Sequence, residues 1–334
     1  MLPAAGPMPV HVPASREAPP LDAEPTLDVS VVVPCYRDGA IIARTCEVLL
    51  DVLSKLGRSF ELILVNDGSP DDTWEQIRRL CEAHPGQVVG VNLWRNFGQH
   101  LAVCAGFSNA RGRIIVTIDS DLQEDPAHLG EMLERLEQGF DVVSGARLQR
   151  AEGWARALPS RLIKAFLQRV TGQHLEDFGC MFRAYRREMA RIIERYPTHT
   201  KLITAYSAWI GARISEIPME HRSRLEKPAS RYTLQALFNM ATDLLANYTY
   251  VPMRLITGCG ILFFLSGMSL AGVLLTYRVI FGAGPSGMAT LVALQFMFAG
   301  VQLGCLGILG AYVGRIYSQV DGKPFVLVRE VLEK

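Results

Sequence analysis

The stretch Thr117-Ile118-Asp119-Ser120-Asp121-Leu122-Gln123-Glu124-Asp125-Pro126 directly follows the apolar run 114–116 and places four acids and one amide within seven positions. Asp119 and Asp121 are two residues apart, so on an extended segment both side chains point to the same side. Two carboxylates held that close are costly unless a cation lies between them or one of them is protonated. With the oxygen of Gln123 they form a donor set that suits Mg²⁺ or Mn²⁺. The sequence therefore predicts a divalent-metal site where a buried strand ends, whereas Asp125, before Pro126, is expected to cap the next helix.

This stretch belongs to an alternation of apolar strands and amphipathic helices. Strands are predicted at 29–33, 60–65, 88–93, 114–118 and 141–144, and helices at 41–56, 72–83, 99–110 and 126–138. Such an alternation indicates an α/β fold with a mostly parallel sheet covered on both faces. After Arg147 the pattern loosens, and we expect an amphipathic helix at 154–170, a basic helix at 183–195 and a late strand at 213–218.

Polar clusters follow the carboxyl ends of three predicted strands, at 36–38, 66–69 and 119–125. In parallel sheets ligands bind beyond these ends, so the clusters are expected to converge on one rim. A single polar loop carries little meaning, and Asp67 alone is compatible with a plain Asx turn. Three loops at equivalent positions favour a nucleotide site, in which Asp67 and Asp38 accept hydrogen bonds from a base N–H or a ribose hydroxyl.

Two long stretches near the C-terminus, Leu255–Tyr277 and Val279–Gly314, contain no charged residue. Each can supply the roughly 20 apolar residues that cross a bilayer, and buried core helices are the alternative. The segment 234–250 has apolar residues at helical spacing and is expected to lie at the membrane surface. Basic residues flank the uncharged stretches at Arg254, Arg315 and Lys323, which places both termini in the cytoplasm by the positive-inside rule.

The composition excludes several classes of protein. The net charge of +1 gives no general preference for nucleic acid, and the seven cysteines form no Cys-x-x-Cys pair that would indicate zinc or a disulfide framework.

The expected organisation is a disordered tail (1–27), a cytoplasmic α/β domain (28–232), an interfacial helix (233–252), two transmembrane helices (253–318) and a C-terminal cytoplasmic segment (319–334). That last segment is expected to return to the α/β domain as a strand or short helix.

The motifs 34–38, 66–69 and 119–123 resemble successive motifs of inverting, nucleotide-sugar-dependent glycosyltransferases with the A-type fold. The uncharged C-terminal stretches narrow the resemblance to polyprenyl-phosphate glycosyltransferases of the bacterial inner membrane. Arg95–His100 and Phe178–Tyr185 narrow it again, to members that transfer 4-deoxy-4-formamido-L-arabinose to undecaprenyl phosphate for lipid A modification. The resemblance covers about Val29 to Val328, and it implies the nucleotide-diphospho-sugar transferase A-type fold and a homo-oligomer such as a tetramer.

The resemblance also implies roles for individual residues. The nucleotide would be held by Pro34, Tyr36, Asp38, Asp67 and Asp119, and the metal on the diphosphate by Asp119, Asp121 and Gln123. The catalytic group would comprise Asp121, Arg147 near a phosphate, Asp177 at the position of a proposed base, and Arg183 as a phosphate-facing arginine. The acceptor phosphate would meet Arg147 and a basic segment that contains Arg222, Arg224, Ser230, Arg231 and Tyr232.

The chain departs from the family pattern at two places. Arg37-Asp38 stands where the family usually has Asn-Glu, which shortens the first nucleotide contact. Pro228 and Arg231 replace a glycine and a lysine of the basic segment, so whether Arg222 or Arg224 is the equivalent arginine stays open. The other arginines of the predicted basic helix are expected on a solvated helix face or in contact with anionic lipid, namely Arg186, Arg187, Arg191 and Arg195.

The implied reaction joins a sugar from a UDP-sugar to polyprenyl phosphate with inversion and releases UDP. The second pKa of a phosphate monoester is about 6, so this nucleophile is largely ionised at neutral pH and a strong general base is dispensable. Glucose, galactosamine and mannose stay open beside formamido-arabinose. A processive polysaccharide synthase is less compatible, because the chain has no Gln-x-x-Arg-Trp motif. A membrane-anchored, non-enzymatic nucleotide-binding scaffold is disfavoured by the intact Asp67, Asp119 and Asp121.

Overall fold

A computed structural model describes residues 24–147, 168, 172, 175–177, 179–195, 203–220, 287–320 and 326–333, together with separate positions between 256 and 282. The described strands are β1 (Leu27–Cys35), β2 (Phe60–Asn66), β3 (Val88–Leu93), β4 (Gly112–Thr117), β5 (Val142–Arg147), β6 (Arg183–Arg186), β7 (Ile214–Met219) and β8 (Val328–Leu332). The described helices are α1 (Ile42–Lys55), α2 (Thr73–Ala83), α3 (Gln99–Asn109), the short η1 (Pro126–His128), α4 (Leu129–Glu137), α6 (Arg187–Arg195), α7 (Ile203–Trp209) and α10 (Gly287–Val320). They divide into two compact units, residues 1–230 with 324–334, and residues 231–323.

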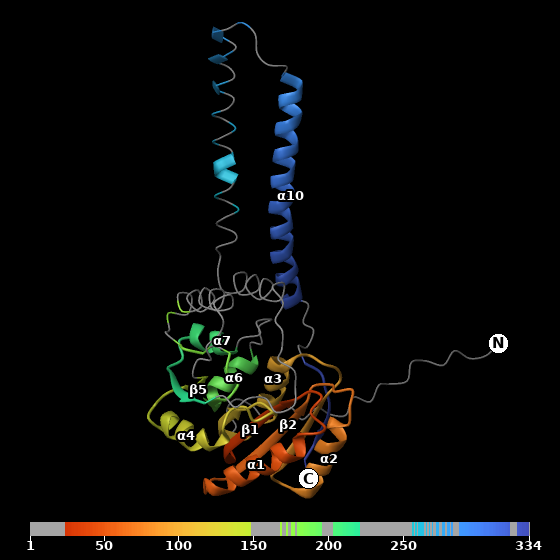
Figure 1. Ribbon diagram of the computed structural model, residues 1–334, viewed down its shortest axis with the longest axis vertical. Helices are drawn as coiled ribbons and strands as arrows, with labels where there is room; N and C mark the ends of the chain where they lie inside the picture. The colour runs from red at the N-terminus through yellow and green to blue at the C-terminus, as the bar shows by residue number, and fades with distance from the viewer. Residues whose placement is uncertain are drawn as a thin grey trace, which may run out of the picture. The chain divides into compact units, whose positions relative to one another are not determined.

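The strands form one eight-stranded sheet in the order β7-β5-β6-β4-β1-β2-β3-β8. Strands β1, β2 and β5 are labelled in Figure 1. Strand β1 pairs in parallel with β2 and β4, and β2 pairs in parallel with β3. Strand β6 lies antiparallel between β4 and β5, so β5 runs in the same direction as β4. The carboxyl ends of β1, β2, β4 and β5 therefore meet at one edge of the sheet, and the predicted mostly parallel sheet is confirmed.

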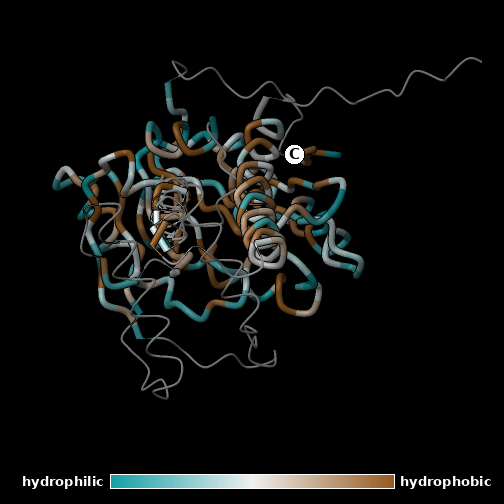
Figure 2. The backbone as a smooth tube through the Cα atoms, turned by 90° about the horizontal axis from the view of Figure 1, so that it is seen from above, coloured by the Kyte–Doolittle hydropathy of each residue, from teal (hydrophilic) through white to brown (hydrophobic). Residues whose placement is uncertain are grey.

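Helices cover both faces of this sheet. Helix α1 buries Ile42, Cys46, Leu49 and Leu53, one stripe at helical spacing, against the same face as α2 and α4. Helices α3, α6 and α7 pack on the other face around Phe107. Each fully buried leucine contributes about 2 kcal/mol by its removal from water. Along the tube in Figure 2, hydrophobic segments alternate with hydrophilic ones, as expected for a core that lies in two layers.

The predicted basic helix at 183–195 is wrong in its first four residues, which form strand β6 before α6 begins at Arg187. These residues fill the gap between β4 and β5 and complete the hydrogen-bond ladder there. Tyr185 is 1% exposed and its ring meets that of Phe107 edge to face, with the centroids 5.4 Å apart. Ladder pairing and aromatic packing thus outweigh the helical spacing of the arginines.

The C-terminal segment returns to the sheet as β8, which pairs antiparallel with β3. Arg111 joins the C-terminus to the interior, because it pairs with Glu333 and with the fully buried Glu61. Glu61 in turn accepts a hydrogen bond of 2.6 Å from the hydroxyl of Ser30. The prediction that the end of the chain packs on the α/β domain is confirmed.

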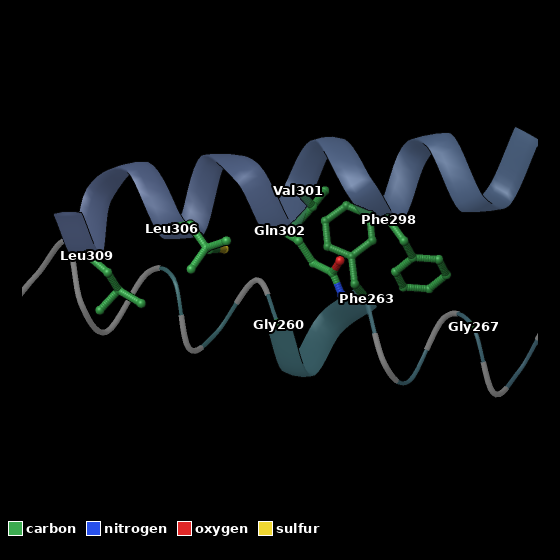
Figure 3. A pocket seen from close by; sticks show the side chains of 9 residues that line it. Gly260, Phe263, Gly267, Phe298, Val301, Gln302, Leu306 and Leu309 are labelled. Carbon is green, nitrogen blue, oxygen red and sulfur yellow. The ribbon is translucent and has the colours of Figure 1, made fainter.

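The second unit contains α10 and separately described helical positions between 256 and 280. An open groove of about 810 Å³ lies between them (Figure 3), and it is lined by Gly260, Phe263, Gly267, Phe298, Val301, Gln302, Cys305, Leu306 and Leu309. Over the part of the chain that the structure describes, we find no helix with the length and apolar character needed to cross a bilayer. The two predicted spans are therefore not confirmed. The predicted helix at 234–250 falls outside the described residues, and so does the one at 154–170 except for Gln168.

Candidate active site

The loops that follow β1, β2 and β4 are bonded directly to one another. The Arg37 N–H donates to the hydroxyl of Ser69, 2.6 Å away, which joins the first loop to the second. The Ser120 hydroxyl donates to Asp38 Oδ2 at 2.7 Å, which joins the first loop to the third. Asp38 Oδ2 also accepts from the Tyr36 N–H, and Asp38 is only 4% exposed. The predicted convergence of the three loops on one edge is confirmed.

Asp67 organises a fourth loop, which follows β3. Its Oδ1 accepts from the Phe97 N–H at 2.7 Å and its Oδ2 from the Gly98 N–H at 2.9 Å. Asp67 is 3% exposed. Burial raises its pKa, and the two N–H groups oppose that rise. In this structure Asp67 thus holds the loop of the Arg95–His100 motif in place, and a direct contact with uridine stays a prediction.

Gly68 lets the loop that follows β3 pack closely against the turn that follows β2. Its φ is +58°, and a Cβ atom built on it would lie 2.2 Å from the backbone carbon of Arg95. Only glycine combines that backbone conformation with so short a separation. The turn Asn66-Asp67-Gly68 is therefore shaped by the packing of the neighbouring loop as well as by its own hydrogen bonds.

The acids after β4 lie on a turn and not on an extended segment, because the Leu122 N–H donates to the Asp119 carbonyl oxygen at 3.3 Å. The strand alternation predicted for Asp119 and Asp121 therefore does not describe this loop. Ser120 is 8% exposed, and its hydroxyl donates to Asp38. Gln99 at the start of α3 donates to Asp119, and Gln123 Nε2 donates to Asp121 Oδ2 at 3.0 Å. Leu122 has a φ of +48°, a left-handed conformation that costs a non-glycine residue roughly 1 kcal/mol. This turn brings Gln123 back against Asp121.

The donor set fits Mg²⁺ or Mn²⁺ in its chemistry. Two carboxylates and an amide are hard oxygen ligands, and these ions complete their coordination with water and substrate phosphate. The amide of Gln123 must rotate to offer its oxygen, because its nitrogen faces Asp121 here. Within the described ranges, no three or more His, Cys, Asp and Glu side chains are grouped as a metal site. A metal site at Asp119, Asp121 and Gln123 stays a prediction.

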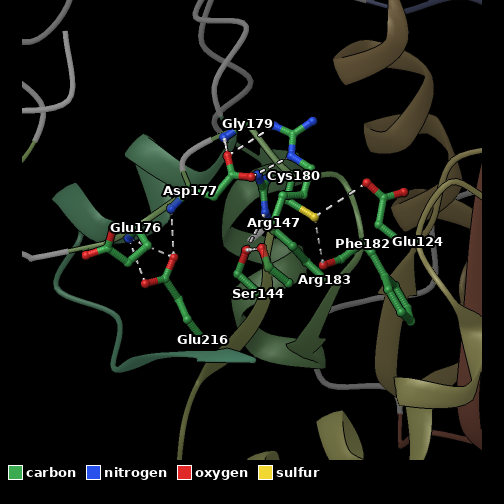
Figure 4. A network of polar contacts seen from close by, with 11 residues as sticks. Glu124, Ser144, Arg147, Glu176, Asp177, Gly179, Cys180, Phe182, Arg183 and Glu216 are labelled. Atoms are coloured by element: carbon green, nitrogen blue, oxygen red, sulfur yellow. Dashed lines mark hydrogen bonds and ion pairs between the residues drawn. The ribbon is translucent and has the colours of Figure 1, made fainter. Parts of the chain in front are cut away.

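Arg147, the last residue of β5, forms a two-pronged ion pair with Asp177 (Figure 4). Its Nε donates to Asp177 Oδ2 at 2.6 Å and its Nη2 donates to Oδ1 at 3.1 Å. Asp177 Oδ1 also accepts from the Gly179 N–H at 2.7 Å. Burial alone would raise the pKa of Asp177, but the hydrogen bonds and charge of Arg147 leave it below its ordinary value. Asp177 is therefore ionised and poorly suited to act as a strong base at neutral pH.

Glu124 and Cys180 lie beside this pair (Figure 4). Glu124 is 2% exposed, and burial raises its pKa while Arg147 opposes the rise. Burial raises the pKa of the Cys180 thiol to about 12, so the thiol stays protonated and unreactive. Asp125, by contrast, accepts a hydrogen bond from the Ala127 N–H at the start of η1, which confirms its predicted role as a cap.

The arginines of 183–195 differ from what we expected. Arg183 is 1% exposed, and its Nε donates to the Ser144 hydroxyl. Its positive charge helps to lower the pKa of Asp177. A direct contact of Arg183 with phosphate stays a prediction. The expected solvated face is wrong for Arg187 and Arg191, which are 6% and 3% exposed. Both donate to the backbone oxygen of Ala110 at the end of α3. These buried guanidinium groups tie α6 to the sheet.

Sequence reasoning missed Gln99, Ser120 and Glu216 as residues that shape the site. Gln99 lies in the Arg95–His100 motif and Ser120 in the 119–123 motif, so their positions in the sequence could have identified them. Glu216 on β7 had no such signal, and its partners are backbone N–H groups. Pro34 lies within β1, and Tyr36 is 38% exposed beyond its end. The predicted acceptor residues Arg222, Arg224, Ser230, Arg231 and Tyr232 lie outside the described residues.

The chain matches known proteins along most of its length. Residues 30–193 match the model of glycosyl transferase family 2. The undecaprenyl-phosphate 4-deoxy-4-formamido-L-arabinose transferase of Proteus mirabilis is 35% identical over 306 residues, which cover 91% of this chain and 94% of that protein. The protein of the same name from Pseudomonas aeruginosa is 37% identical over 311 residues, which cover 91% and 90% of the two chains. These matches confirm the resemblance that the motifs carry.

Among solved structures, glucosyl-3-phosphoglycerate synthase from Mycobacterium tuberculosis with Mn²⁺, UDP-glucose and phosphoglyceric acid has a TM-score of 0.45 and 23% identity. The structural match covers 66% of this chain and 79% of the synthase chain. The α/β fold with a mostly parallel, mixed sheet is the A-type arrangement expected from the sequence. The chain therefore belongs to glycosyl transferase family 2 and is a glycosyltransferase similar along nearly its whole length to the undecaprenyl-phosphate formamido-arabinose transferases.

Proposed function

We propose that this protein transfers 4-deoxy-4-formamido-L-arabinose from its UDP-sugar to undecaprenyl phosphate, with inversion, and releases UDP. The observation that carries the proposal is the 35% identity over 91% of the chain to a relative that bears this activity in its name. That match covers 94% of the relative, so it includes the C-terminal half of the chain as well as the α/β domain. The arrangement of acids and arginine at the sheet edge supports the same reaction.

The sheet edge offers two kinds of group to a nucleotide sugar. The loops after β1 and β2 present Tyr36, which is 38% exposed, beside the inner layer formed by Asp38 and Asp67. We assign this part to the nucleotide. Arg147 is the last residue of β5, and the acids at 119–125 follow β4, which lies on the other side of β6. We assign these groups to the diphosphate and the acceptor phosphate.

Asp119, Asp121 and Gln123 would hold a divalent cation on the donor diphosphate. When bound, the cation would neutralise the negative charge that grows on the leaving UDP. Arg147 supplies a permanent positive charge at the same edge, because the Asp177 carboxylate raises the already high pKa of its guanidinium against the effect of burial. Its planar fork matches two oxygens of a phosphate as well as it matches Asp177 here.

The acceptor phosphate is already anionic near neutral pH, so deprotonation is not the main demand of the reaction. The lowered pKa of Asp177 agrees with this assignment. We therefore assign Asp177 to the orientation of Arg147, and through it of the phosphate. The remaining arginines of the acceptor site would come from the segment 222–232.

We place the reaction at the cytoplasmic face of the bacterial inner membrane, with both termini in the cytoplasm and a homo-oligomer as the working unit. The two uncharged stretches at 255–277 and 279–314 support a membrane location, and the multi-pass arrangement rests on the sequence alone. Extraction of cell membranes with alkaline carbonate tests it, since a spanning protein stays in the pellet and a peripheral one is released.

The function is tested by incubation of the purified full-length protein with undecaprenyl phosphate, Mn²⁺ or Mg²⁺ and a panel of radiolabelled UDP-sugars. We expect a chloroform-soluble product with the formamido-arabinose donor and release of one UDP for each sugar transferred. A product with UDP-glucose instead would keep the reaction and replace the sugar. Absence of any lipid-linked product from the whole panel, with UDP-sugar still bound, would reject the transfer itself.

A further inference from the structure

The segment around Asp177 is held from two sides by different strands. On one side Asp177 pairs with Arg147 at the end of β5. On the other side the carboxylate of Glu216 accepts hydrogen bonds from two consecutive backbone N–H groups. Glu216 Oε2 lies 2.7 Å from the Glu176 nitrogen, and its Oε1 lies 3.0 Å from the nitrogens of both Glu176 and Asp177 (Figure 4).

The position of Glu216 on β7 is fixed by the sheet. Strand β7 lies parallel to β5, with Glu216 in register with Ser144 and Met219 in register with Arg147. Ser215, Ile217 and Met219 are buried on one side of the strand, so Glu216 belongs to the other. A carboxylate that accepts from backbone N–H groups forms charge-assisted hydrogen bonds, which are stronger than neutral ones. Glu216 is thus a rigid anchor on a strand next to the one that carries Arg147.

We propose that Glu216 is a positioning residue for phosphate recognition: it fixes the backbone at Glu176 and Asp177 so that the Asp177 carboxylate holds the Arg147 guanidinium in one orientation. This inference deepens the proposed function and rests on it for its catalytic consequence. Its structural part, the anchoring of the Asp177 backbone, stands on the hydrogen bonds alone.

A second feature of the same segment shows how closely the orientation of Arg147 is controlled. A Cβ atom on Gly179 would lie 3.0 Å from Arg147 Nη2 and 3.4 Å from Asp177 Oδ1. The Gly179 N–H also donates to Asp177 Oδ1. The segment therefore leaves space for the guanidinium on one side while Glu216 fixes its backbone on the other.

The structural part is tested by hydrogen exchange of the full-length protein, read on peptides that cover 175–182. Glu216→Ala removes the acceptor for two amides, so we expect exchange in these peptides to be at least tenfold faster than in wild type. Glu220→Ala is the matched control, because Glu220 is an exposed glutamate just beyond the same strand. Unchanged exchange in Glu216→Ala, or the same increase in both variants, would overturn the anchoring.

The catalytic part is tested by transfer kinetics. We expect Glu216→Ala to lower kcat/KM for undecaprenyl phosphate about tenfold, mostly through KM, with kcat within about threefold of wild type and UDP affinity unchanged. Glu216→Gln keeps an oxygen that can take the place of Oε1, which both amides share, so its loss is expected to be only about threefold. A fall in kcat and in UDP affinity together would point to general damage of the fold and against positioning.

The double variant decides whether Glu216 acts through Asp177. In an Asp177→Ala background the further loss from Glu216→Ala is expected to be under twofold, because the side chain that it positions is gone. A further tenfold loss would mean that Glu216 acts independently, and the proposal would be wrong. If wild-type protein transfers no sugar, the proposed function fails, while the exchange experiment still decides whether Glu216 anchors the segment.

Discussion

The two halves of the sheet edge balance their charges in opposite ways. After β1, β2 and β4, the carboxylates of Asp38, Asp67 and Asp119 are bound by uncharged donors, namely backbone N–H groups, a hydroxyl and an amide. Such donors stabilise a carboxylate without cancelling its charge. After β5, the guanidinium of Arg147 is bound by the carboxylate of Asp177. These hydrogen bonds leave the carboxylate charges in place, which suits the proposed cation, whereas in the second half a phosphate bound as proposed would have to share or replace an existing ion pair.

The largest effect is expected at the acids after β4, where we propose that a cation holds the diphosphate. Asp121→Ala removes a ligand of the proposed cation, so charge on the leaving UDP is no longer neutralised. We expect kcat to fall about a thousandfold, roughly 4 kcal/mol of transition-state stabilisation. The measurement is transfer of radiolabelled sugar to undecaprenyl phosphate over a range of Mn²⁺ concentrations.

The matched control for this variant is Asp125→Asn, four positions further on in the same loop. Asn also caps helices, so the hydrogen bond with the Ala127 N–H is kept and activity should stay near wild type. If Asp121→Ala retained wild-type activity that still depended on metal, the assignment of the cation to this half of the edge would have to be abandoned.

The second effect concerns the part of the sheet edge after β5, which carries Arg147. Arg147→Lys keeps the charge but replaces the two-pronged fork by a single ammonium, which cannot bind Asp177 or a phosphate at two oxygens. We expect kcat/KM for undecaprenyl phosphate to fall about a hundredfold, close to 2.7 kcal/mol. Steady-state kinetics with varied acceptor at saturating UDP-sugar measure it.

Arg213→Lys serves as its comparison, since Arg213 forms a similar two-pronged pair with Asp141 at 3.2 and 3.3 Å elsewhere on the same domain. That side chain is 68% exposed, so little change in activity or stability is expected. Equal losses in the two variants would show that Arg147 matters as a surface ion pair and that it makes no special contact with phosphate.

The third effect tests whether Asp177 removes a proton. We expect Asp177→Asn to lower kcat by less than tenfold, about 1.4 kcal/mol, because the acceptor phosphate is already ionised and Asp177 mainly orients Arg147. A single-turnover assay at pH 7 measures the chemical step. A loss of a thousandfold in that step, with acceptor binding intact, would instead identify Asp177 as an essential base.

The same residue predicts a dependence of stability on pH. The pKa of Asp177 is lowered in the folded protein, so its contribution to the free energy of unfolding is full above its unfolded value of about 3.9 and is lost as pH falls through the folded value. The melting temperature of Asp177→Asn should therefore lie below that of wild type at pH 6 and approach it below about pH 4. A constant difference down to pH 3 would contradict the pairing with Arg147.

The two halves also differ in how much of them could be predicted from the sequence. Asp38, Asp67, Asp119 and Asp121 follow strands of a regular alternation, and parallel strands bring their carboxyl ends together whatever the details of packing. Strand β6 broke that alternation. Its arginines had the spacing of a basic helix, and only the open place between β4 and β5, together with the contact of Tyr185 with Phe107, made it a strand.

The contacts of the part after β5 could not be predicted from the sequence, for a related reason. Glu216 bonds to backbone N–H groups, which every residue but proline carries, so no pattern of side chains marks its partners. Likewise Arg187 and Arg191 bond to backbone oxygens at the end of α3, and their charge alone suggested solvent. Charge predicts partners well where side chains meet side chains and poorly where they meet the backbone.

The smallest effect is expected from the link between the first and third loops. Ser120→Ala removes the 2.7 Å hydrogen bond to Asp38 and leaves the proposed metal ligands unchanged. We expect a loss of about 1 kcal/mol in the free energy of unfolding, as for a typical buried hydrogen bond. Because Asp38 also accepts from the Tyr36 N–H, the exposed Tyr36 should lose some of its fixed orientation, and KM for UDP-sugar should rise two- to fivefold with kcat unchanged.

The control is Ser54→Ala, which removes an exposed hydroxyl contact on α1 and should change neither the free energy of unfolding nor KM for UDP-sugar. A drop in kcat without a change in KM would mean that Ser120 supports the proposed cation site itself. The loop at 36–38, assigned to the nucleotide, and the loop at 119–123, assigned to the cation, would then form one functional unit.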